Sequence, residues 1–118
     1  MNASDALRAF LVPLLPGWHL QYGRWLDADK TARYAVLRPM GGVPVSLVRR
    51  PQFTLQLIGG ANDVLQLPES VAQTVIAAMN VSAGTLVFME PGEPVFWATD
   101  DGRPIAELAI STITNNHS

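Results

Sequence analysis

Few side chains in this sequence have the type and spacing that catalysis or metal binding requires. His19 and His117 are its only histidines, and they stand near opposite ends of the chain. One group of carboxylates, which could meet across a hairpin to do acid–base work or hold a divalent cation, comprises Glu90, Glu93, Asp100 and Asp101. Turns select acidic residues and glycine for backbone reasons, and those reasons already explain this group. We therefore expect no catalytic residue and no metal site.

Nucleophiles and cofactor motifs also lack the partners that their chemistry needs. No serine stands in a Gly-x-Ser-x-Gly elbow or has a histidine and an acid in plausible company. The chain has no cysteine, which excludes thiol catalysis and disulfides. The pairs Gly41-Gly42 and Gly59-Gly60 lack both the Lys-Ser/Thr ending of a phosphate-binding loop and the three-glycine dinucleotide fingerprint. We interpret them as strand breaks and expect no cofactor.

The residues best suited to a functional role are those that favour contact between proteins. The candidate interface comprises Arg38, Arg49, Arg50, Trp97, Asp100 and Asp101. Its arginines form the one basic concentration, and guanidinium groups pair with carboxylates in bidentate geometry at interfaces. The two aspartates are a natural counterpart, and the adjacent tryptophan suits an interface anchor. We predict that an arginine-rich loop reaches a neighbouring subunit's acidic turn; the alternative is a solvated connection between two strands.

The overall composition also favours contact between subunits. Only 15% of the 118 residues are charged and 48% are hydrophobic, whereas an ordinary soluble domain has about 25% charged residues. A protomer that buries surface against its neighbours needs fewer charged side chains, so we expect an oligomer. The net charge of -2 offers no attraction to a phosphate backbone, and we expect no nucleic-acid partner.

The N-terminal region does not have the pattern of a signal peptide, because an acidic residue comes early and no continuous apolar core follows. The longest apolar stretches, near residues 11–15 and 75–79, are far shorter than the roughly 20 residues that span a bilayer. We expect a soluble, cytoplasmic protein without a membrane partner.

Hydrophobic periodicity predicts the elements that position these residues. Two helices are expected near residues 5–12 and 67–79. Strand patterns cover residues 18–22, 32–39, 43–48, 52–57, 85–89, 95–99 and 105–114. Asp101-Gly102 between the last two is a strong hairpin signal. The order predicts an α+β fold in a single domain, residues 1–118, with one mainly antiparallel sheet, two helices packed on one side and a long C-terminal β-hairpin.

This layout resembles the small tail-terminator, tail-completion and minor tail or capsid proteins of long-tailed bacteriophages. The resemblance rests on the N-terminal helix before a strand pair, on the block from Tyr34 to Gly42 that leads through Arg49-Arg50-Pro51 into the strand 52–57, and on the later helix followed by the hairpin around Asp101-Gly102-Arg103-Pro104. It implies a non-enzymatic subunit of a ring, commonly hexameric, that caps the tail tube and meets other tail or neck proteins. The location would then be the virion tail or neck, or the host cytoplasm. No individual site residue is transferred.

A second hypothesis is a small ligand-binding or regulatory domain. In that case the aromatic residues Trp18, Tyr22, Trp25 and Trp97 would line an apolar pocket instead of a subunit contact. An enzyme is the third hypothesis, and it depends only on the carboxylate group and His19.

Overall fold

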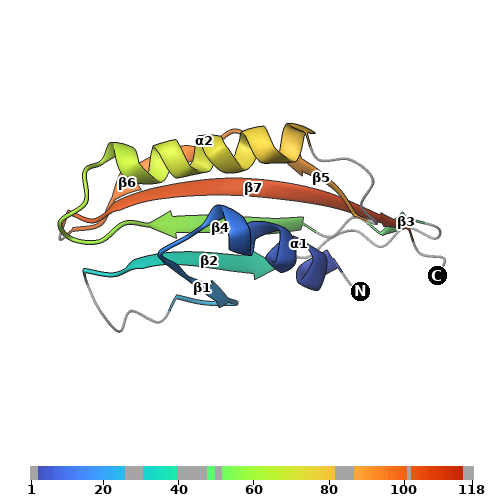
Figure 1. Ribbon diagram of the computed structural model, residues 1–118, viewed down its shortest axis with the longest axis horizontal. Helices are drawn as coiled ribbons and strands as arrows, with labels where there is room; N and C mark the ends of the chain where they lie inside the picture. The colour runs from blue at the N-terminus through green and yellow to red at the C-terminus, as the bar shows by residue number, and fades with distance from the viewer. Residues whose placement is uncertain are drawn as a thin grey trace.

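The computed structural model describes residues 3–25, 31–39, 48–49, 52–81, 87–100 and 102–115. The helices are α1 (Ala3–Leu11), the short 3-10 helix η1 (Val12–Leu14) and α2 (Gln66–Val81). The strands are β1 (Trp18–Tyr22), β2 (Arg33–Pro39), β3 (Val48–Arg49), β4 (Gln52–Ile58), β5 (Val87–Pro91), β6 (Val95–Ala98) and β7 (Pro104–Asn115). Figure 1 shows an elongated sheet with β7 running along most of its length. The predicted α+β class is confirmed.

The sheet is mainly antiparallel, as the sequence predicts. Its strands follow the order β1-β2-β4-β7, and β6 and β5 pair along the other side of β7. β1 lies parallel to β2, whereas the other described pairs are antiparallel. The predicted C-terminal hairpin is formed by β6 and β7.

β7 sets the register of its neighbours on both sides. β4 faces it in one continuous register that begins with Gln52 opposite Ser111. β3 keeps this register, with Arg49 opposite Thr114, so it prolongs the line of β4. The remainder of the predicted strand 43–48 lies outside the described residues.

On the other side of β7, the edge of the sheet contains a β-bulge. Pro91 of β5 faces Ile110, whereas Val95 of β6 faces Glu107, so β5 and β6 differ by one residue in their register against β7. The bulged side therefore holds one extra residue, and bulges and prolines are common devices at sheet edges. β5 and β6 together form one interrupted edge.

Both helices pack on the same face of the sheet, as predicted. α1 buries Leu7 and Leu11, and α2 buries Ala72, Val75 and Met79, at the spacing that puts them on one side of each helix. The sheet residues that face them are Ala35, Leu37, Phe53, Leu55, Leu57, Ala106, Leu108 and Ile110. We call this the helix face. Within the described residues, neither helix is long and apolar enough to cross a bilayer.

The opposite face of the sheet, here called the outer face, has a smaller core. It buries Tyr34, Val36, Ile58 and Ile105, and Trp25 packs against them. Successive strand residues point to opposite faces, so β2 is buried on both sides. The apolar run of residues 32–39 predicts this arrangement.

The turn after β4 depends on close approach of two backbone segments. A Cβ atom added to Gly60 would overlap the carbonyl oxygen of Thr31 and lie 2.8 Å from its carbonyl carbon. The Gly60 N–H also donates a hydrogen bond of 2.7 Å to the Asp63 carboxylate. Only glycine fits here, so the pair Gly59-Gly60 does more than end a strand.

We predict that Gly60→Ala destabilises the fold by about 1–3 kcal/mol, the scale of overpacking against rigid neighbours. Urea denaturation monitored by tryptophan fluorescence would measure the change. Gly92→Ala is the matched control, because its added Cβ would lie 3.4 Å from Ala109. Equal stability of the two variants would contradict the close approach of residue 60 to Thr31.

Candidate assembly surface at the β6 edge

The hairpin between β6 and β7 closes through a compact set of hydrogen bonds around Thr99. The Thr99 N–H donates to the Arg103 carbonyl at 2.9 Å, and the Gly102 N–H donates to the Thr99 carbonyl at 2.9 Å. The Arg103 N–H donates to the Thr99 hydroxyl at 2.9 Å. Gly102 has a φ of 84°, a conformation that glycine adopts without steric cost. The Asp-Gly signal in the sequence therefore marks a real hairpin.

The Arg103 side chain ties this hairpin to the rest of the sheet. It is fully buried, and it donates to the carbonyls of Gly59 at 3.0 Å and Ala32 at 3.1 Å. Its guanidinium carbon lies 4.9 Å from the ring centre of Trp25 and 5.8 Å from that of Tyr34. Sequence reasoning missed this role, because an arginine after a turn is ordinarily exposed.

A second contact, between Arg33 and Asp63, holds the neighbouring turn. The Arg33 Nε and Nη2 atoms donate to the two Asp63 carboxylate oxygens, each at 2.9 Å. These bonds lower the pKa of Asp63 below the ordinary value of 3.8, and the Gly60 N–H bond lowers it further, against a smaller opposing effect of burial. The Arg103 hydrogen bonds and the Arg33–Asp63 ion pair together fix the strand ends and turns at the hairpin end of the sheet.

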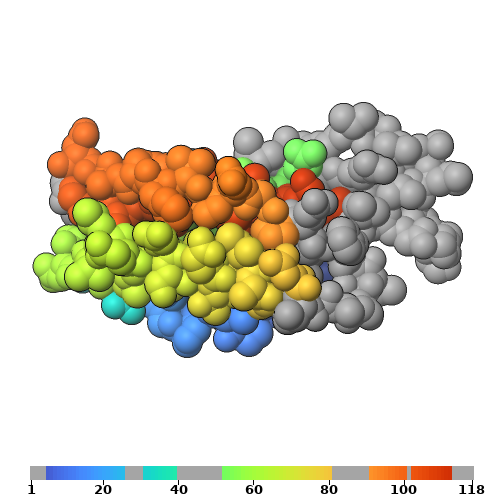
Figure 2. Space-filling model, turned by 90° about the horizontal axis from the view of Figure 1, so that it is seen from above, coloured from blue at the N-terminus to red at the C-terminus, as the bar shows by residue number. Residues whose placement is uncertain are grey.

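The β6 edge, at this hairpin end of the sheet, exposes several apolar side chains to solvent. All four residues of β6 are exposed, including Val95 at 57%, Phe96 at 44% and Trp97 at 40%. The turn before α2 adds Val64 at 66% and Leu65 at 61%. We call these five residues the β6 edge patch. Figure 2 shows the β6 segment, in orange, side by side with α2.

A pocket of about 300 Å³ lies within this patch, between β6 and the start of α2. Its lining residues are Leu65, Gln66, Glu69, Phe96, Trp97, Ala98 and Ile105. Exposed aromatic and aliphatic side chains grouped in this way mark contact surfaces for other proteins. Trp97, which the sequence suggests as an interface anchor, is exposed and lines this pocket beside Leu65 and Phe96.

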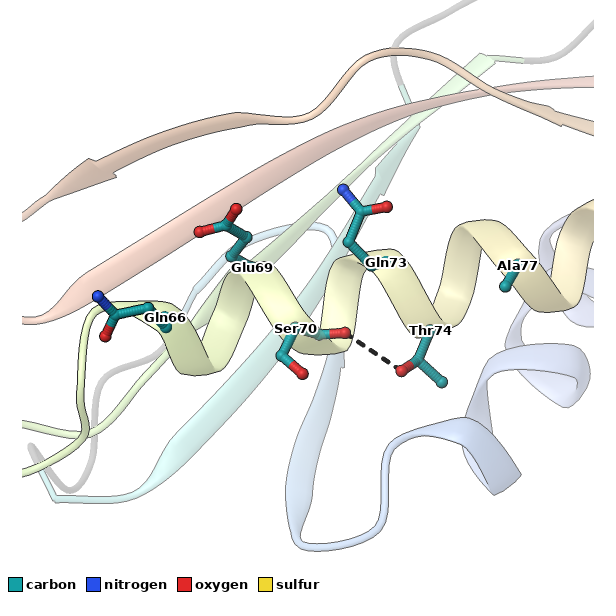
Figure 3. Close-up of a pocket in the computed structure, with 6 residues that line it drawn as sticks. All are labelled: Gln66, Glu69, Ser70, Gln73, Thr74 and Ala77. Carbon is teal, nitrogen blue, oxygen red and sulfur yellow. Dashed lines mark hydrogen bonds between the residues drawn. The ribbon is translucent and has the colours of Figure 1, made fainter.

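A shallower depression runs along the outward side of α2, and Figure 3 shows its lining. The residues are Gln66, Glu69, Ser70, Gln73, Thr74 and Ala77. All are exposed and come from one helix, and the Thr74 hydroxyl donates to the Ser70 carbonyl at 3.1 Å. Glu69 is the one ionisable group among them, so the depression offers no set of converging catalytic groups.

The candidate arginines lie in different environments. Arg38 is half-buried in β2, and its Nε is buried without a hydrogen-bond partner among the described residues. Arg49 was expected in a loop between two strands, and this was wrong: Arg49 belongs to β3 and pairs with Thr114. The reason is that β3 and β4 follow one register along β7, so Arg49 continues a strand line. Arg50 lies outside the described residues.

The acidic turn stands at the other end of the molecule. Asp100 is exposed next to the start of β7, while Asp101 lies outside the described residues. From Pro104 to Thr114, β7 spans about 33 Å at the usual rise of an extended strand. Arg49 and Asp100 therefore cannot meet within one molecule, and any pairing between them must join two molecules.

The four aromatic residues proposed for a ligand pocket do not come together. Trp18 packs against the core on the helix face, whereas Trp25 packs against the outer face. Tyr22 lies in β1, and Trp97 lies in β6, at the two opposite sides of the strand order. The carboxylates are also separated, since Glu93 precedes β6 and Asp100 follows it. Within the described residues, no three His, Cys, Asp or Glu side chains group closely enough to hold a metal ion.

An open α+β sheet with a rigid end and an exposed apolar edge defines a protein suited to contacts with other proteins. Comparison with known families agrees with this class: the family model described as phage tail termination protein matches residues 1–116. The chain therefore belongs to the phage tail termination protein family, a family of structural phage proteins, as the resemblance implies. No curated protein matches the chain.

We predict that Asp63→Asn lowers the free energy of unfolding at pH 7 by about 1–2 kcal/mol, because the charged hydrogen bonds with Arg33 are lost. The loss is limited because Arg33 is partly exposed and solvent screens the ion pair. A carboxylate whose pKa is lower in the folded state than in the unfolded state stabilises the fold. This stabilisation is complete above the unfolded-state pKa and is lost as pH falls through the folded-state pKa. The difference from wild type should therefore shrink as pH falls below the ordinary 3.8. Urea titrations from pH 7 to 2 would measure it, with Asp100→Asn as control. A constant difference would contradict the role of this carboxylate.

We predict that Arg103→Met destabilises the fold by about 2–4 kcal/mol, because the buried Gly59 carbonyl and the partly buried Ala32 carbonyl lose their charged donor. Denaturant unfolding monitored by tryptophan fluorescence, to which Trp25 contributes, would report the change. Arg24→Met is the matched control, since Arg24 is exposed. An unchanged stability for Arg103→Met would show that the buried guanidinium does not hold the hairpin.

Proposed function

We propose that this chain is a non-enzymatic subunit of the tail-terminator or head–tail completion ring of a phage or prophage particle. It acts through protein–protein assembly in the virion tail or neck. Family membership over residues 1–116 supports the phage role. The β6 edge patch is the observation that carries the assembly role, because its five exposed apolar residues are costly to leave in water.

The partners in this proposal are further copies of the chain and other tail or neck proteins. No cofactor, nucleic acid or membrane takes part. The low charged content of 15% fits a protomer whose surface is partly covered in the particle.

The two ends of the molecule are the second element of the proposal. One end carries Trp97 and Asp100, and the other carries Arg49 of β3, with Arg38 towards the same end of β2. Asp101 and Arg50, their neighbours in the sequence, lie outside the described residues. Because these ends lie far apart in one chain, their charges are available to different partners. The arginine end contacts an acidic surface of the next tail protein.

We predict that light scattering coupled to size exclusion shows a ring-sized species whose population increases with protein concentration. Trp97→Ala should weaken this species by about tenfold or more, the scale of an interface anchor. Arg49→Ala with Arg50→Ala should weaken binding to purified tail tubes most at low salt, because exposed charge pairs are screened at high salt.

Thr74→Ala is the matched control, since Thr74 is exposed on α2 away from both ends and bonds within its own helix. A protein that stays monomeric at every concentration and also fails to bind purified tail tubes would overturn the proposed function.

A further inference from the structure

The two outermost strands of the described sheet, β1 and β6, lie at the same level along the strand direction. One line of facing residues crosses the sheet as His19, Tyr34, Ile58, Ile105 and Trp97. The next line contains Leu20 at one side and Phe96 at the other. A second molecule placed beside the first in the same orientation would therefore bring its β1 level with β6.

The strand directions also agree with such a placement. β1 runs parallel to β2, and three antiparallel steps lead from β2 through β4 and β7 to β6. β6 therefore runs opposite to β1, so the two strands would meet as an antiparallel pair. The helix faces of both molecules would lie on the same side of the joined sheet.

The backbone of β6 offers hydrogen-bonding groups on its outer side. The Thr99 N–H donates to Arg103 across the hairpin. Inward and outward groups alternate along an antiparallel strand, so the N–H and C=O groups of Phe96 and Ala98 point away from β7. These are the groups that a further strand would use.

The charges of the two sides are complementary. Residues 1–50 carry seven Lys or Arg and three acids, whereas residues 51–102 carry six acids and no Lys or Arg. The first segment builds α1, β1, β2 and β3, and the second builds β4, α2, β5 and β6. Of the basic residues, Arg49 belongs to β3, which pairs with β7 and not with the β1 edge. Among the described residues, exposed charges near the two edges include Arg8 and Arg24 beside β1, and Glu69, Glu93 and Asp100 beside β6; Asp5, on the same helix as Arg8, is also exposed.

Exposed apolar residues follow the same division. The β6 edge patch supplies five of them, and the remaining large ones in the described residues are Val12 at 59% and Tyr22 at 43%. Tyr22 belongs to β1, and Val12 belongs to η1, which leads into it. Apolar surface is therefore present at both edges.

We infer that the β6 edge of one copy pairs with the β1 edge of the next copy, head to tail, and joins their sheets. This inference rests on the proposed function and specifies its self-contact. On the helix face, Phe96 would meet the Leu20 and Tyr22 side of β1. On the outer face, Trp97 would meet His19. A contact between two different edges repeats from subunit to subunit and closes into a ring where the rotation per step allows it.

Two edge-blocked variants test the pairing. Phe96→Asp places a carboxylate on β6, and Tyr22→Asp places one on β1, so each variant keeps one intact edge. Alone, each should self-associate about tenfold or more weakly than wild type. An equimolar mixture should form a dimer and stop there, because one intact β6 edge meets one intact β1 edge and the two blocked edges repel. Light scattering and native mass spectrometry would measure the species.

Control variants separate lost contact from lost folding. Ala98→Pro removes an outward N–H of β6 while keeping the apolar surface, which edge strands tolerate. Val12→Asp alters the β1 side outside the strand. Ala98→Pro should weaken self-association as Phe96→Asp does, and Val12→Asp should weaken it as Tyr22→Asp does. The circular dichroism spectrum and the melting temperature of both variants should be unchanged. Ala77→Glu, exposed on α2 two turns beyond Glu69, should assemble as wild type does.

Three other outcomes would each overturn the edge pairing, the ring or both. Dimers of Tyr22→Asp alone, with no gain on mixing, would show that two β6 edges pair with each other and would overturn the inference. Wild-type-like assembly of both blocked variants would overturn the edge pairing and leave the ring itself standing. A wild type that is monomeric at all concentrations would overturn the ring and the edge pairing together.

Discussion

The pairing register of β7 is the constraint on which the rest of this structure depends. β7 contacts β3 and β4 on one side and β5 and β6 on the other. A slip of one residue would exchange its two faces and turn Leu108 and Ile110 away from the helices. The helix-face core, the hairpin and the level of β6 relative to β1 all follow from this single alignment.

Polar groups reinforce the alignment where the apolar core ends. At the hairpin end, the buried Arg103 bridges the strand ends through backbone carbonyls, and Arg33 with Asp63 closes the adjoining turn. Buried donors and acceptors are costly unless paired, so such sites favour one arrangement of the chain. That rigidity matters for an assembly surface, because a preorganised edge loses less entropy when it meets a partner.

The surface divides along the same architecture. Among the described residues, the basic Arg8 and Arg24 lie beside β1, whereas the acidic Glu69, Glu93 and Asp100 lie beside β6. Exposed apolar residues lie at both edges. Unlike surfaces on one molecule favour heterologous contacts, in which each subunit presents a different face to each neighbour.

The sequence by itself determined the fold class, most elements and the hairpin, because apolar periodicity and Asp-Gly turn chemistry are local signals. It also led to the prediction that Trp97 is an interface anchor, and the structure leaves this side chain exposed. It did not reveal the strand position of Arg49, the burial of Arg103 or the bulge before β6. Those depend on which strand pairs with β7 and in what register, and such long-range pairings leave no local trace. The tertiary structure alone decided that β1 and β6 lie level at opposite edges, because that placement is the sum of several strand registers.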